Sequence, residues 1–260
     1  MTTLLERETL ALPGGRSQVV FRGGGGPPLV WLHAANGIDD LHPLVNALQS
    51  RFTVIAPLAP GFDDQADLDG VDDVHELAMH YEELLDALGL DEATVVGHSF
   101  GGMIGAELAA HYPQRVRRLV LIAPVGLWND DYPVIDFFAV PLPELPKVLF
   151  ADEEVAAVAF PPPEAEPDVE MLVTLARGLT SVAKFMWPIP DRGLARRLYR
   201  ISAPTLVVWG EQDALAPARY ADDFAAAIPD ARTLIVPGAG HMVPVERPDE
   251  VLSAIEEFLE

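Results

Sequence analysis

Short apolar runs alternate with helical patterns along most of this chain, and this alternation constrains the fold more than any other feature. Apolar runs separated by helices are typical of a parallel sheet that helices cover on both faces. The predicted strands are "QVVFRG" (18–23), "PPLVWLHA" (27–34), "FTVIAPLAP" (52–60), "ATVVGHS" (93–99), "RRLVLIAP" (117–124), "APTLVVWG" (203–210) and "ARTLIVP" (231–237). The predicted helices are "VDDVHELAMHYEELLDALGL" (71–90), "GGMIGAELAAHY" (101–112), "PARYADDFAAAIP" (217–229) and "ERPDEVLSAIEEFLE" (246–260). The sequence therefore predicts an α/β fold.

One region, residues 126–200, breaks this alternation. It has no clear buried strand, a proline run "FPPPEAEP" (160–167) and a predicted helix "DVEMLVTLARGL" (168–179). Because a loop of this length without structure would be unusual, we expect a helical cap inserted between the two parts of an α/β core, 1–125 and 201–260. Its apolar and aromatic content indicates an apolar ligand of modest size. The aromatic residues predicted to bind it are Trp128, Phe137, Phe138 and Trp187.

A serine lies between glycines where the strand 93–99 passes into a helix, in "GHSFG" (97–101). A tight turn from strand to helix presents the side chain of Ser99 at the carboxyl end of a strand, where ligands bind in open α/β sheets. Close packing around such a turn requires small residues at Gly97 and Gly101. The alternative is that Ser99 only caps the helix. The strand–turn–helix context favours a nucleophile.

Two later segments can supply the base that a serine nucleophile needs. Asp213 follows the strand 203–210, and His241 lies in a glycine-rich loop after the strand 231–237. The chain order Ser, Asp, His is the one expected for this arrangement. Neighbouring parallel strands place their following loops at the same sheet edge, so the sequence predicts a triad of Ser99, His241 and Asp213.

An oxyanion formed by attack of the serine requires two NH donors. The backbone NH of Phe100 is the first predicted donor, because it opens the helix after Ser99. The second is expected from the loop "HAANG" (33–37), with Ala35 as the first choice and Ala34 as the second. We expect structural hydrogen-bonding roles for His33 and His98. Surface or helix-end positions are expected for His42, His75, His80 and His111.

Composition excludes several other functions. The net charge of −23 repels phosphate backbones, so no nucleic-acid partner is expected. The chain has no cysteine, and its acidic pairs lack histidines at ligand spacing, so no metal is expected. "GGGG" (23–26) lacks dinucleotide-binding spacing, and no cofactor is expected. The chain shows neither a signal peptide nor an apolar run of the roughly 20 residues that cross a bilayer, which predicts a cytoplasmic protein without a membrane partner. Homo-oligomerisation is left open.

The chain resembles the α/β-hydrolase superfamily, in the cap-bearing branch of small serine esterases, cofactor-free haloperoxidase-like enzymes and carbon–carbon bond hydrolases. The resemblance rests on "LVWLHAANG", "GHSFGGMIGAELAAHYPQRVRRLVLIAP", "PTLVVWGEQDALAP" and "VPGAGHMVPVERPDEV". It implies an eight-stranded, mostly parallel sheet with flanking helices, a helical lid between the sixth and seventh strands, and a Ser–His–Asp triad. The implied activity is hydrolysis of a small-molecule ester or related acyl substrate through an acyl-enzyme.

Several residues depart from patterns within this superfamily. His33-Ala34 stands where His-Gly is usual. Dehalogenases and epoxide hydrolases carry an aspartate nucleophile, which Ser99 argues against. Carbon–carbon bond hydrolases typically have Asn before the serine and Gly-Pro in the oxyanion loop; His98 and "HAANG" match neither. The alternatives to an esterase are a haloperoxidase or perhydrolase, a carbon–carbon bond hydrolase, and a ligand-binding receptor or pseudoenzyme of the same fold.

Overall fold

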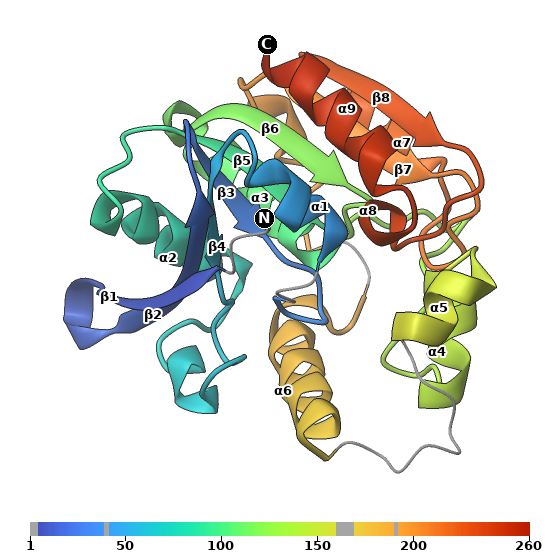
Figure 1. Ribbon diagram of the computed structural model, residues 1–260, viewed down its shortest axis with the longest axis horizontal. Helices are drawn as coiled ribbons and strands as arrows, with labels where there is room; N and C mark the ends of the chain where they lie inside the picture. The colour runs from blue at the N-terminus through green and yellow to red at the C-terminus, as the bar shows by residue number, and fades with distance from the viewer. Residues whose placement is uncertain (1–4, 39–41, 160–168, 190–191) are drawn as a thin grey trace.

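A single eight-stranded sheet forms the centre of the molecule (Figure 1). The computed structural model describes residues 5–38, 42–159, 169–189 and 192–260. The strand order is β1-β2-β4-β3-β5-β6-β7-β8. Only β2 runs antiparallel to its neighbours β1 and β4, which confirms the predicted mostly parallel sheet. The strands are β1 Glu6–Ala11, β2 Ser17–Gly24, β3 Pro28–Leu32, β4 Thr53–Pro57, β5 Ala93–His98, β6 Val116–Ile122, β7 Thr205–Gly210 and β8 Ala231–Val236.

Helices cover both faces of the sheet, and each face has its own apolar core. On one face α1 (Pro43–Leu48), α8 (Val243–Glu246) and α9 (Pro248–Leu259) pack on the sheet. On the other face lie α2 (Val74–Ala87), α3 (Phe100–His111) and α7 (Tyr220–Ala227). Every side chain of β5 and β7 is buried, as in a strand covered on both sides. Short 3-10 turns are found at Pro13–Gly15, Gln65–Leu68, Pro113–Arg115, Leu142–Glu144 and Leu198–Arg200.

The chain between β6 and β7 contains helices α4 (Leu145–Leu149), α5 (Glu153–Ala159) and α6 (Val169–Met186). In Figure 1 α4 and α5 lie next to each other and α6 lies apart from them, all three beyond one end of the sheet. The second half of α6 packs into the main core through Val182 and Phe185, whereas Val169 and Val173 at its start are exposed. The boundaries 126–200 for a cap stay a prediction, and the proline run at 160–167 lies outside the described residues.

Several elements were not predicted individually from the sequence, among them β1, α1 and the short helices α4, α5 and α8. Strand β1 is an edge strand with alternating exposed side chains, and its apolar content is too low to give a strand signal. Helix α1 has only six residues, which is too short for a clear helical period. None of the helices in the described ranges is both long and apolar enough to cross a membrane.

His80 differs from its predicted surface or helix-end position. It lies within α2 and is buried, with Nδ1 facing the Arg16 guanidinium and Nε2 facing the Gln18 side-chain oxygen. Burial and the neighbouring Arg16 charge lower the pKa of His80 to about 4. The neutral ring can therefore accept from Arg16 at Nδ1 and donate to Gln18 at Nε2. This network ties α2 to the start of β2.

Candidate active site

Ser99 occupies a strained turn between β5 and α3. Its φ of 54° and ψ of −113° are unusual for a residue with a side chain. The turn is held by the Ser99 NH, which donates to the Ile122 carbonyl at 2.9 Å, and by the Ser99 carbonyl, which accepts from the Met103 NH at 3.0 Å. A Cβ at Gly101 would collide with the Leu32 carbonyl oxygen, and one at Gly97 would collide with the Gly101 carbonyl. The close approach of three backbone segments therefore requires these glycines.

The structure brings Ser99, His241 and Asp213 into one hydrogen-bonded chain. The distance from Ser99 Oγ to His241 Nε2 is 2.8 Å, and that from His241 Nδ1 to Asp213 Oδ2 is also 2.8 Å. Ser99 follows β5, Asp213 follows β7, and His241 follows β8, so the three meet at the carboxyl edge of the sheet. A neutral imidazole in this arrangement donates from Nδ1 to the carboxylate and accepts the serine hydroxyl at Nε2.

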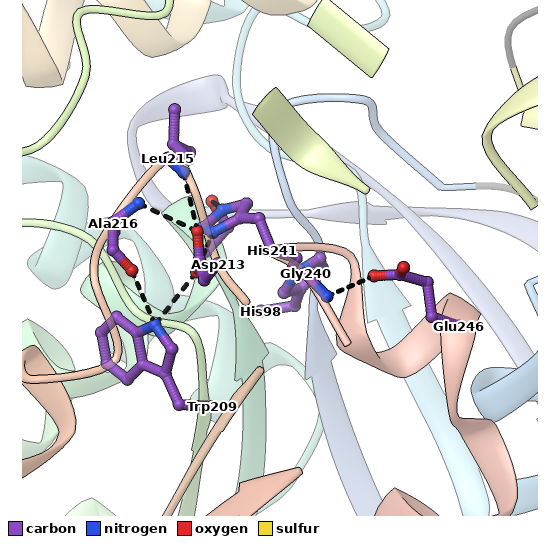
Figure 2. Close-up of polar contacts among 9 residues, drawn as sticks. His98, Trp209, Asp213, Leu215, Ala216, Gly240, His241 and Glu246 are labelled. Atoms are coloured by element: carbon purple, nitrogen blue, oxygen red, sulfur yellow. Dashed lines mark hydrogen bonds and ion pairs between the residues drawn. The ribbon is translucent and has the colours of Figure 1, made fainter. Parts of the chain in front are cut away.

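Each carboxylate oxygen of Asp213 accepts two hydrogen bonds. Its Oδ1 accepts from the NH groups of Leu215 and Ala216, both at 2.9 Å. Its Oδ2 accepts from His241 and also from the indole NH of Trp209 at 3.0 Å (Figure 2). Ser99, Asp213 and His241 are 8%, 7% and 2% exposed. In such a shielded site, charges interact more strongly than in water.

Trp209 was not singled out from the sequence, because "TLVVWG" indicates only a buried strand. We expect Trp209→Phe to lower kcat about tenfold, since a hydrogen bond to a charged group contributes about 1.5–3 kcal/mol. The free energy of unfolding should also fall, because the Ala216 carbonyl loses the same donor. Steady-state kinetics and urea unfolding measure the two effects. Trp31→Phe, a matched change in the core of the opposite sheet face, should leave kcat unaltered. An equal kcat for both variants would contradict the role of Trp209.

Two further histidines lie beside the site as hydrogen-bonding groups. His33 donates from Nδ1 to the Ala34 carbonyl at 2.6 Å and accepts the Ala59 NH at Nε2 at 2.8 Å. Burial lowers the pKa of His33 to about 4, so this pattern of a neutral ring persists at physiological pH. His98 Nε2 donates to the His241 carbonyl at 3.0 Å. Burial, and then the neighbouring His241 charge, hold the pKa of His98 well below its usual value.

The two predicted oxyanion donors follow neighbouring strands of the sheet: Phe100 comes directly after Ser99, which follows β5, and Ala35 comes after β3. Phe100 is the first residue of α3, and Ala35 lies in the turn closed by the Gly37 NH on the Ala34 carbonyl at 3.1 Å. Within the described part of the chain, neither the Phe100 NH nor the Ala35 NH donates a hydrogen bond. Both NH groups can therefore take an acceptor from a ligand. Their role, and that of the second choice Ala34, stays a prediction.

The four aromatic residues predicted to bind substrate occupy different environments. Phe137 is buried in the main core with its ring 4.1 Å from that of Phe138, and the Trp128 indole NH donates to Asp130. Trp187 is 57% exposed at the end of α6. No hydrogen bond or ring contact in the described ranges joins these four to the triad, and their role stays a prediction.

Phe185 is an aromatic contact to the site that was not selected from the sequence. Its ring stacks on Phe100 with the centroids 6.2 Å apart and links α6 directly to the turn that carries Ser99. Across residues 5–38, 42–159, 169–189 and 192–260, no three His, Asp or Glu side chains gather in a way that could hold a metal ion.

Comparison with known proteins identifies the family. The profile of the family described as alpha/beta hydrolase fold matches residues 27–248. The acetyltransferase component of an acetoin cleaving system from Pseudomonas putida is 34% identical over 95% of this chain and 67% of its own length. A 2-hydroxy-6-oxononadienedioate/2-hydroxy-6-oxononatrienedioate hydrolase from Comamonas testosteroni is 27% identical over 94% of this chain and 88% of its own length.

Among solved structures, a naproxen esterase from Bacillus subtilis has a TM-score of 0.73 at 18% identity, covering 98% of this chain and 92% of that one. At this identity the likeness supports the fold. The family profile covers the elements that carry Ser99, Asp213 and His241. The chain belongs to the α/β-hydrolase fold family.

Proposed function

We propose that this protein is a serine hydrolase that cleaves a small apolar ester through an acyl-enzyme. The observation that carries the proposal is the continuous chain from Ser99 Oγ through His241 to Asp213, with 2.8 Å at each link. A serine hydroxyl is a weak nucleophile until a neighbouring base removes its proton. The proposal is supported by the hydrogen bond between His241 Nε2 and Ser99 Oγ and by the buried Asp213 carboxylate on the other ring nitrogen.

The reaction has two halves. In the first, His241 Nε2 takes the Ser99 proton while Oγ attacks the ester carbonyl, and the Phe100 and Ala35 NH groups stabilise the oxyanion. His241 then gives that proton to the leaving alcohol as the C–O bond breaks. In the second half, His241 takes a proton from water, the hydroxyl attacks the acyl carbon, and Ser99 regains its proton as the acid leaves. Asp213 stabilises the charged imidazole in both halves.

The surroundings of the triad favour an apolar substrate. The stacked Phe100 and Phe185 rings lie next to the nucleophile turn, and both are almost completely buried. A buried apolar surround offers little solvation for a charged acyl group. The naproxen esterase that shares this fold is, by its name, a carboxylesterase.

Turnover of p-nitrophenyl acetate, butyrate and octanoate tests the proposal, with Ser99→Ala as the blank. We expect hydrolysis by the parent, a burst of p-nitrophenol before the steady state, and none of this in the variant. A parent that hydrolyses no ester faster than Ser99→Ala would overturn the proposal.

Carbon–carbon bond hydrolysis is a second candidate, favoured by the relative from Comamonas testosteroni, whose name describes hydrolysis of a dienedioate. The same triad would serve, with a ketone carbonyl in place of the ester. His98 before the nucleophile and the "HAANG" loop argue for the ester. A dienedioate of that class, tested beside the p-nitrophenyl esters, separates the two candidates by their kcat/KM values.

Transfer of the acyl group to a thiol is an alternative reaction that also needs a test, because the relative from Pseudomonas putida is an acetyltransferase component by name. Addition of a dithiol during p-nitrophenyl acetate turnover should leave acetate as the product if water is the acceptor. Accumulation of thioester would show transfer in place of hydrolysis.

A further inference from the structure

Glu246 is a buried carboxylate close to the proposed base, and no step of the proposed reaction uses it. It ends α8 and is 5% exposed. Its Oε2 accepts from the Gly240 NH at 2.8 Å (Figure 2), and its Oε1 accepts from the NH groups of Ala151 and Asp152, both at 2.8 Å. Burying a charged carboxylate costs free energy unless hydrogen-bond donors compensate it. The three donors here come from two segments that lie far apart in the sequence, the loop before His241 and residues 151–152.

The three bonds join the His241 loop to the segment between α4 and α5. The Met242 NH donates to the Leu149 carbonyl at 3.0 Å, so the same segment also holds the residue after the base. A Cβ at Gly240 would lie 2.7 Å from the Ala151 nitrogen, which shows that the two backbones are in direct contact. The side chains of Phe150, Ala156 and Met242 form a small apolar cluster at this junction.

The backbone around His241 is thereby held at three successive residues. Glu246 holds the Gly240 NH, His98 donates to the His241 carbonyl, and Leu149 accepts the Met242 NH. The imidazole must keep two 2.8 Å hydrogen bonds, one to Ser99 and one to Asp213. A displacement of about 1 Å in such an arrangement can lower the rate about 100-fold.

We propose that Glu246 is a positioning residue that fixes the His241 loop against the 149–152 segment and so sets the rate of attack by Ser99. The inference rests on the proposed function of the triad. Glutamine has the same shape, yet one of its two head-group atoms is an NH2 donor. Because Oε1 faces two NH groups and Oε2 faces a third, either orientation of the amide sets a donor against a donor.

The test compares Glu246→Gln with Glu250→Gln, which removes the same charge from an exposed position on α9. A fluorophosphonate probe gives two readouts: the amplitude of labelling counts competent sites, and its rate reports how well His241 activates Ser99. For Glu246→Gln we expect parental amplitude, labelling rate and kcat at least about tenfold lower, and KM within about threefold of the parent. Glu250→Gln should match the parent in all of them.

A labelling rate and a kcat per labelled site within about twofold of the parent would overturn the proposal, even if the amplitude or the melting temperature fell. Such a result would give Glu246 a purely structural role. If Glu246→Gln does not fold, Glu246→Asp replaces it with the same readouts, since it keeps the carboxylate and loses reach. A parent that is neither labelled nor active counts against the proposed function instead, whatever the variants do.

Discussion

Replacing Ser99 by alanine is expected to lower kcat for ester hydrolysis by about 10⁶-fold, the largest effect of any single substitution in this chain. The reason is that in the proposed reaction the hydroxyl forms the covalent intermediate, and no other hydroxyl is hydrogen-bonded to His241 in the described ranges. His241→Ala should cost a similar factor, because the hydroxyl is then left without its base. The double variant should be little slower than either single variant, since the two residues act as one unit.

Stopped-flow and steady-state kinetics on p-nitrophenyl butyrate measure these losses. Ser253→Ala is a suitable control, because its hydroxyl donates to the Asp249 carbonyl on the surface of α9. That variant should retain the parental kcat. A Ser99→Ala variant with more than about a hundredth of the parental kcat would be incompatible with a serine nucleophile.

Asp213→Asn is expected to lower kcat by about 10⁴-fold, the second largest effect. Oδ1 faces the NH groups of Leu215 and Ala216, so the asparagine oxygen should occupy that position. The amide NH2 must then face His241 Nδ1, which becomes an acceptor. The ring proton moves to Nε2, where it points at Ser99 Oγ, and the imidazole can no longer accept the serine proton.

Kinetics of Asp213→Asn beside Asp222→Asn test this prediction, because Asp222 is exposed on α7. The control should keep its activity and the fold should survive in both variants, as far-UV circular dichroism would show. A loss of less than about tenfold in Asp213→Asn would mean that the carboxylate does not set the tautomer of His241.

The sequence was most informative where one local pattern determines one feature. Strands buried on both faces, such as β5 and β7, give continuous apolar runs. Ser99 could be proposed because Gly97 and Gly101 mark a turn that only glycine fits. Asp213 and His241 could be proposed because each follows a predicted strand, and parallel strands bring such loops to one edge.

The sequence was less informative where a role depends on distant partners. Glu246 stands at the start of the predicted helix 246–260, but it is buried, and two of its three NH donors lie about 95 residues earlier in the chain. Likewise, the spacing of aromatic residues in 126–200 does not indicate which rings face the core. Phe185 contacts the nucleophile turn, whereas Trp187, two residues later, is exposed.

Mass spectrometry of the protein after reaction with a fluorophosphonate shows whether Ser99 is the activated nucleophile, because the adduct on such a serine is stable. We expect one adduct per chain, located on the peptide that contains Ser99, absent in Ser99→Ala and formed far more slowly in His241→Ala. A folded parent protein that stays unmodified, or an adduct on any residue other than Ser99, would contradict this expectation.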